Sequence, residues 1–153
     1  MQLLFRYNWQ VRDEWFQLLK RLPEEELIRE RVGGIGSFLR TLHHIVDVEQ
    51  AWILLALQQL PGSHYKFEDY KNLDAIERLS NSCRTEVEKF VNSWSNELEE
   101  NILDDFTFGE IMRHVIAHEI HHIGQLSVWI RELGFDPASA NVIGRGLHSN
   151  GKH

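Results

Sequence analysis

Apolar residues recur at helical spacing along most of this chain, and no stretch shows the period-two alternation of a half-buried strand. The helical pattern defines four long stretches, whose limits follow from cap and turn residues. This pattern predicts an all-α protein, most simply a four-helix bundle. The expected helices cover about Leu3–Leu22, Ser37–Leu60, Asp74–Asn101 and Thr107–Leu133.

Cap and turn residues set these limits. Pro23 ends the first helix, although Pro23–Leu27 could add one short helical turn. Ser37 is the expected N-cap of the second helix, and Pro61-Gly62 ends it. The third and fourth helices both open with a cap residue followed three residues later by a glutamate, and Gly134 is the expected C′ residue of the fourth.

The connector between the second and third helices is long. Its residues, Pro61–Leu73, can span about 43 Å when fully extended. A helix of the length expected here is roughly 36–42 Å long. The connector could therefore cross the whole bundle, and we expect the second and third helices to run parallel. The shorter gap before Thr107 suits an antiparallel neighbour.

Length, charge and cysteine content limit the class of protein. The 153 residues suit a single domain, residues 1–153, with residues 148–153 expected to form a disordered tail. The net charge of −7 and the lack of a basic stripe argue against nucleic-acid binding. The longest apolar run, Ala51–Leu57, is far short of the roughly 20 residues that span a membrane. A single cysteine, Cys83, and no visible secretory signal lead us to expect a cytoplasmic protein.

Histidines are unusually frequent: the chain has nine, and several of them gather on the fourth helix. At about 100° per residue, His122 falls within the apolar arc of this helix and His118 at its edge. His114 and His121 fall on the polar side. Because residues four apart have Cβ atoms about 5–6 Å apart, His118 and His122 could converge on one metal ion.

The second helix offers a third histidine. His44 lies on the apolar side of this helix, whereas His43 is expected to face water. Three inward histidines would leave the fourth position of a tetrahedral metal open to water or substrate. The alternative is that these histidines are ordinary surface or core residues, or that they serve a pH-dependent packing role.

Two glutamates lie in the middle of apolar arcs, Glu49 on the second helix and Glu119 on the fourth. An unpaired buried charge is prohibitive, so the simplest interpretation is that each pairs with a buried arginine or tyrosine. Arg12 and Tyr7 on the first helix are available. The functional interpretation is that one glutamate orients a ligand histidine.

The segment His118–His122 matches H-E-x-x-H, the helix motif of zinc peptidases. Such a peptidase also needs a third ligand downstream and usually an edge strand that holds the substrate. Beyond this segment only His148 and His153 remain, in the expected disordered tail, and Glu119 lies toward the core. The sequence therefore argues against peptidase activity.

Three segments carry motifs in a fixed order along the chain. They are Tyr7-Asn8-Trp9, His44-Ile-Val-Asp-Val-Glu49-Gln-Ala-Trp52 and His114-Val-Ile-Ala-His118-Glu-Ile-His-His122-Ile-Gly124-Gln125. Together these motifs resemble the DinB family, the damage-inducible DinB and YfiT-like group of metalloenzymes rather than the DNA polymerase that shares the name. The resemblance runs from the first helix to about Leu147.

This resemblance implies a four-helix bundle with up-down-down-up topology and a long crossover between helices two and three. It implies a divalent metal, commonly zinc or nickel, held by His44, His118 and His122. Homodimers are usual in the family. Some relatives are thiol S-transferases that use bacillithiol, mycothiol or glutathione.

Two classes of function are consistent with these observations. The first is a metal-dependent enzyme, in which the open metal position lowers the pKa of a low-molecular-weight thiol cosubstrate for thiol S-transfer or activates water for hydrolysis. The second is a non-catalytic, metal-binding stress protein in which the metal and the dimer are structural. The sequence names no residue that chooses between them.

Overall fold

The computed structural model describes residues 1–147, so the predicted disordered tail, residues 148–153, lies outside the described residues. The all-α prediction is confirmed: helices build the fold, and the described strands are two residues long. In chain order the elements are α1 (Gln2–Leu19), α2 (Glu24–Ile28), α3 (Phe38–Gln50), the π-helix η1 (Ala51–Leu57), the 3₁₀ turn η2 (Phe67–Asp69), α4 (Leu73–Asn92), α5 (Asn96–Glu99), β1 (Ile102–Leu103), β2 (Phe106–Thr107) and α6 (Phe108–Glu132).

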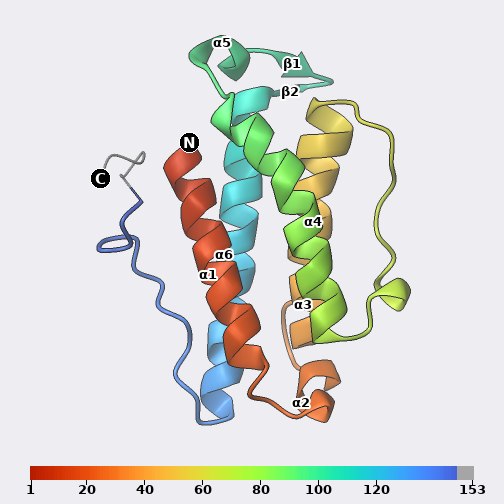
Figure 1. Ribbon diagram of the computed structural model, residues 1–153, viewed down its shortest axis with the longest axis vertical. Helices are drawn as coiled ribbons and strands as arrows, with labels where there is room; N and C mark the ends of the chain where they lie inside the picture. The colour runs from red at the N-terminus through yellow and green to blue at the C-terminus, as the bar shows by residue number, and fades with distance from the viewer. Residues whose placement is uncertain (148–153) are drawn as a thin grey trace.

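The long helices α1, α3, α4 and α6 pack side by side along the long axis (Figure 1). In the view of Figure 1, α1 and α6 run downward, whereas α3 and α4 both run upward. The connector between η1 and α4 returns along the outside over the length of the bundle. The second and third long helices are therefore parallel, as the length of the connector predicts.

The interior is filled by large apolar side chains that come from all four long helices. Trp15, Phe38 and Leu126 belong to a cluster near one end of the bundle, and each is fully buried. Phe5 and Met112 belong to a second cluster toward the other end. Each such side chain contributes about 1.5–3 kcal/mol by burial, so the apolar core is a large stabilising term for the helix arrangement.

Two of the expected N-caps are confirmed and one is wrong, and Gly134 is the C′ residue of α6 as predicted. Ser37 Oγ accepts a hydrogen bond from the backbone N–H of Arg40 at 3.2 Å. Thr107 and Glu110 form the predicted capping box at the start of α6. The expected cap Asp74 is instead a residue of the first turn of α4, because Asn72 caps this helix.

The later parts of two predicted helices take other forms. The second does not continue as an α-helix to Leu60: it becomes the π-helix η1 after Gln50 and ends at Leu57. The third ends at Asn92 rather than at Asn101. The residues that follow form α5 and the hairpin of β1 and β2, whose two-residue strands are too short to show an alternating pattern in sequence.

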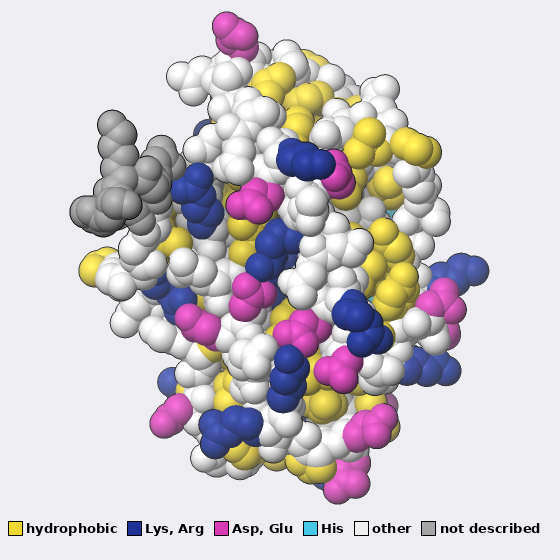
Figure 2. All heavy atoms as spheres, viewed as in Figure 1, with side chains coloured by type: hydrophobic (Ala, Val, Ile, Leu, Met, Phe, Trp, Pro, Cys, Tyr) yellow, Lys and Arg dark blue, Asp and Glu magenta, His cyan; other side chains and the backbone are white. Residues whose placement is uncertain are grey.

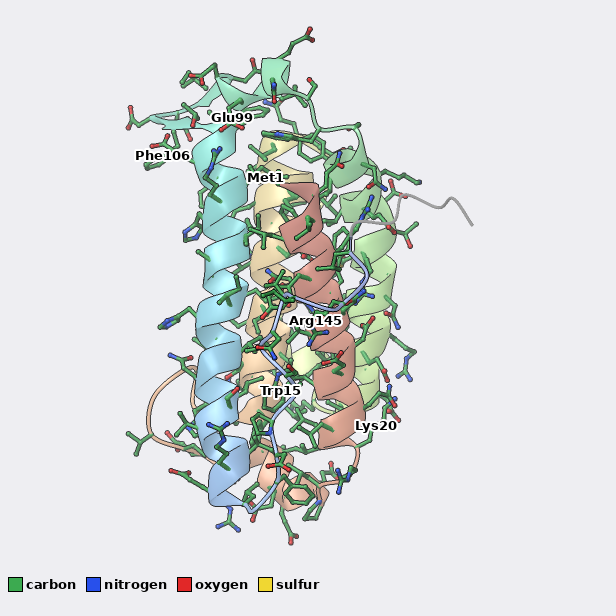
Figure 3. The ribbon with its side chains drawn as sticks, turned by 90° about the vertical axis from the view of Figure 1, so that its left-hand side faces the viewer. Met1, Trp15, Lys20, Glu99, Phe106 and Arg145 are labelled. Atoms are coloured by element: carbon green, nitrogen blue, oxygen red, sulfur yellow. The ribbon has the colours of Figure 1, made fainter. Side chains whose placement is uncertain are left out.

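The segment after α6 packs back along α1 (Figures 1 and 3). Tyr7 Oη donates a hydrogen bond to the carbonyl oxygen of Ala140 at 2.9 Å, and Arg145 pairs with Glu14 at 2.7 Å. Figure 2 shows positive and negative side chains interspersed on the face over α1 and α4. Within residues 1–147, no helix combines the length and the apolar character that crossing a membrane requires.

Candidate metal centre

Three histidine side chains meet between α3 and α6. His44 comes from the middle of α3, and His118 and His122 come from successive turns of α6. The Nε2 atom of His118 lies 3.0 Å from Nε2 of His44 and 3.2 Å from Nε2 of His122. The three predicted ligands therefore converge, with one ligand atom from each within 4.8 Å of the others.

This spacing is compatible with metal binding. Nitrogen atoms bound at about 2.0–2.1 Å to one tetrahedral zinc ion lie roughly 3.3–3.4 Å apart. When two neutral imidazoles face each other, one ring nitrogen can donate its proton in a hydrogen bond to the other. Nε2 of His118, however, faces the Nε2 atoms of both His44 and His122. A cation among them would receive all three lone pairs. Among the described residues, the group contains three ligand side chains. A tetrahedral metal ion bound by them would have its fourth coordination position open.

Gln125 fixes which nitrogen of His122 faces the centre. The Nδ1 atom of His122 lies 2.7 Å from Gln125 Oε1, which can only accept a hydrogen bond. Nδ1 therefore carries the proton, and the lone pair of Nε2 is directed toward the other histidines. The amide of Gln125 donates in turn to His121 Nε2 at 3.1 Å. Gln125 is the last residue of the third DinB-like motif, but the sequence alone does not predict this role.

A glycine in the loop before α3 makes room for Gln125. Gly34 has a positive φ of 55°, which most residues avoid. A Cβ atom at this position would lie 2.9 Å from Gln125 Oε1 and 2.9 Å from the ring of Trp129. The side chain that orients His122 is therefore confined by a backbone approach that only glycine permits.

The histidines of the cluster are held in the neutral form. Burial, together with the neighbouring imidazoles of His122 and His44, lowers the pKa of His118 to about 3. Burial also lowers the pKa of His44 and of His122. Metal ligands must be deprotonated, so at neutral pH the lone pairs of all three rings are available without prior loss of a proton.

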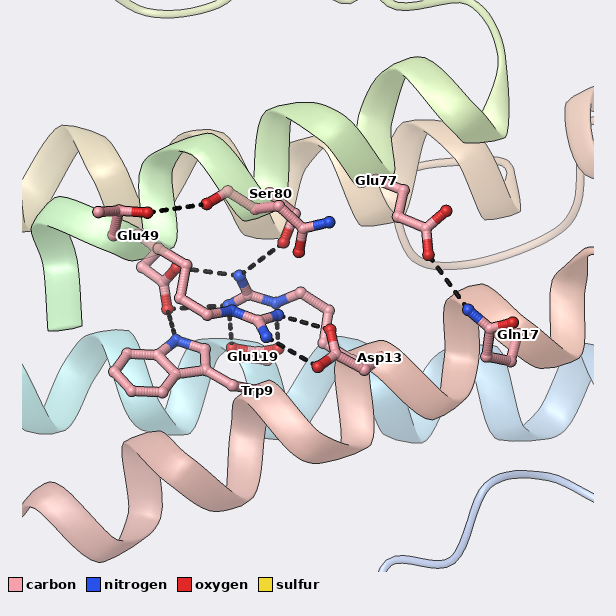
Figure 4. A network of polar contacts seen from close by, with 11 residues as sticks. Trp9, Asp13, Gln17, Glu49, Glu77, Ser80 and Glu119 are labelled. Carbon is pink, nitrogen blue, oxygen red and sulfur yellow. Dashed lines mark hydrogen bonds and ion pairs between the residues drawn. The ribbon is translucent and has the colours of Figure 1, made fainter.

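A buried ionic network joins α1, α3 and α6 (Figure 4). Arg12 of α1 is fully buried and donates to both carboxylates predicted to be buried, Glu49 of α3 and Glu119 of α6. Trp9 Nε1 donates to Glu49 at 3.0 Å, and Ser80 lies 3.3 Å from Arg12. The prediction that these glutamates pair with a buried arginine is confirmed, and Arg12 links the two helices that carry the histidines.

The charges of this network depend on one another. Burial alone lowers the pKa of Arg12, but the carboxylates of Glu119 and Glu49 outweigh it and raise this pKa well above its usual range. Burial raises the pKa of Glu119 despite the adjacent Arg12. Glu119 is 2% exposed and bound to Arg12, so it is not free to act as the general base of an H-E-x-x-H peptidase.

His43 does not face water as the sequence predicts. Its side chain is 6% exposed and lies against the rings of Phe67 and Tyr70, with ring centroids 5.5 and 5.8 Å away. These aromatic residues belong to the connector between η1 and α4, which covers this face of α3. His43 is buried outside the three-histidine group.

Two further histidines of α6, His114 and His121, are exposed, in agreement with their predicted polar side.

Fold and site together define an all-α bundle protein with three convergent histidines on two helices, a group suited to a divalent metal. The chain belongs to the DinB family, whose family model matches residues 1–146. It is also 45% identical, over 154 aligned residues and 96% of each chain, to a Bacillus subtilis (strain 168) protein called "Uncharacterized protein YizA". The family resemblance drawn from the sequence motifs is confirmed.

Proposed function

We propose that this protein is a divalent-metal-dependent enzyme whose ion, zinc or nickel, is held by His44, His118 and His122. The convergence of the three Nε2 atoms is the observation that supports this proposal. The chain's membership in the DinB family is compatible with it. The imidazole donor set suits both zinc and nickel.

When bound, the ion supplies a Lewis acid that lowers the pKa of a thiol or a water molecule at its remaining position. The chain's own residues prepare the site for this role. Gln125 keeps the proton of His122 on Nδ1, and burial keeps His118 neutral. Arg12 holds α3 and α6 together through Glu49 and Glu119. We propose thiol S-transfer with a low-molecular-weight thiol as the reaction, with hydrolysis as the alternative.

A thiol-conjugation screen tests this proposal. Untagged, zinc- or nickel-loaded protein is incubated with bacillithiol, mycothiol or glutathione and a panel of electrophiles, and product formation is followed by mass spectrometry. Conjugation that is at least 100-fold faster than with the metal-free protein or with His118→Ala would support the proposal. Equal rates for all three preparations would contradict it.

The non-catalytic alternative makes a different prediction for metal removal. The apolar core and the Arg12 network are built without the three histidines. We therefore expect the chelated protein to keep its helical circular dichroism signal and a cooperative thermal transition. Loss of the folded state on chelation would instead assign the metal a structural role. The homodimer expected from the family resemblance stays a prediction.

A further inference from the structure

A cavity of about 240 Å³ is lined by residues of η1, β2 and α6, and α6 also carries His118 and His122. Its lining is almost entirely apolar and comes from Trp52 of η1, Phe106 of β2, and Glu110, Ile111 and His114 of α6. Figure 3 places Phe106 at the end of the bundle where α6 begins. The hairpin that follows α5 therefore contributes one wall of the cavity.

His114 connects this cavity to the three-histidine centre. Its ring centroid lies 6.0 Å from that of Trp52 and 5.8 Å from that of His118. Residues His114 and His118 are one helical turn apart, which is a rise of about 6 Å. A lining residue of the cavity is therefore a direct neighbour of His118 in the histidine group.

The size and charge of the cavity limit what it can hold. An apolar cavity of about 150 Å³ is large enough for benzene, so this one admits a single aromatic ring or a branched alkyl group. None of the lining residues is a lysine or an arginine, and Glu110, at its edge, is engaged by the backbone and hydroxyl of Thr107. An anionic group would therefore meet no lysine or arginine in the lining and would face the carboxylate of Glu110.

We propose that this cavity binds the uncharged apolar group, aryl or branched alkyl, of the substrate that reacts at the three-histidine centre. This inference rests on the proposed function and deepens it by naming the class of substrate. Trp52 and Phe106 are the residues that select this group, because their rings form two walls of the cavity. The π-helical form of the segment that carries Trp52 fits this role, since such turns occur frequently at functional sites.

Apolar thiols test the proposal, because a thiol can occupy the metal while its substituent enters the cavity. Phenylmethanethiol and ethanethiol are titrated into cobalt-loaded protein, and binding is read from the cobalt absorption spectrum. We expect phenylmethanethiol to bind at least tenfold more tightly, as burial of a ring predicts. A third probe, 4-(sulfanylmethyl)benzoate, is expected to lose most of this preference.

A matched pair of variants in the hairpin gives the control. Phe106 lines the cavity, whereas Ile102 of the paired strand does not, and their side chains are 53% and 62% exposed. Phe106→Ala should reduce the preference for phenylmethanethiol at least threefold, and Ile102→Ala should leave it unchanged. Equal affinities for the two thiols, or equal effects of the two substitutions, would overturn the proposal.

A second readout separates failure of this inference from failure of the proposed function. The indole N–H resonance of Trp52, assigned by its loss in Trp52→Phe, is followed in metal-free protein as phenylmethanethiol is added. A saturable shift without any cobalt binding would support the cavity and contradict the metal-dependent function. Stoichiometric cobalt binding with no shift and no thiol preference would leave the metal-dependent function standing and overturn the cavity assignment.

Discussion

Gln125 determines which nitrogen of His122 is free to bind a metal, because its oxygen accepts the proton on Nδ1. Replacing the amide by an apolar side chain of similar size removes this acceptor. We expect Gln125→Leu to lower the affinity for zinc by about 10–100-fold, the usual effect of losing a partner that orients a ligand. Competition with a chromophoric chelator measures the affinity.

The matched control for Gln125→Leu is Gln17→Leu, since Gln17 is an exposed glutamine hydrogen-bonded to Glu77 at 3.2 Å and belongs to α1. This control should bind zinc like the wild type. If Gln125→Leu also binds zinc with wild-type affinity, Gln125 does not orient His122.

His118 makes the stability of the metal-free protein depend on pH. Its pKa is about 3 in the folded state, whereas that of an unfolded histidine is about 6.5. Between these values the unfolded state binds the proton and the folded state does not. The stability contributed by neutral His118 is therefore complete above about pH 6.5 and is lost as the pH falls toward 3.

The expected result is a smaller loss of unfolding free energy for His118→Asn than for the wild type when the pH is lowered from about 7.5 to about 5. Urea titration of the two chelated proteins measures it. Identical losses would show that His118 is not held neutral by the fold.

At the scale of whole elements, Arg12 ties α1 to both helices that carry the histidines, through Glu49 and Glu119. Arg12→Leu would leave two buried carboxylates without the guanidinium that binds both of them. We expect it to lower the free energy of unfolding by about 3–5 kcal/mol, measured by urea denaturation. Lys89→Ala, which removes the exposed pair with Glu86, should cost less than about 1 kcal/mol. Equal effects would mean that the buried network does not join the helices.

Local sequence signals predict the start of α3 and of α6 correctly, because Ser37 and Thr107 cap through residues only three positions away. The early end of α4 at Asn92 is not predicted, since the residues that follow are compatible with a helix and take other forms in α5 and the hairpin. His43 is misplaced for a related reason. A helical wheel identifies the face of a helix that packs on the core. It contains no information on Phe67 and Tyr70, which belong to a distant connector and cover the opposite side of α3.

At the scale of the whole molecule, α6 carries two of the three histidines and also lines the apolar cavity. The sequence predicts that His44, His118 and His122 come together, because each falls on or at the edge of the apolar face of its own helix. The roles of Gln125 and Gly34 could not be predicted in this way, since they depend on how the loop before α3 packs against α6. The apolar periodicity of the sequence thus predicts which face of each helix carries the ligand histidines. The orientation of their rings depends on tertiary packing.

The most direct test of the central claim is the metal content of untagged protein, since a histidine tag would bind nickel itself. Elemental analysis after gel filtration should find one divalent ion per chain in the wild type and in His43→Ala, whose side chain is buried outside the cluster. His44→Ala, His118→Ala and His122→Ala should each retain less than about a tenth of it. One tightly bound ion in all the variants, or none in the wild type, would contradict the three-histidine centre.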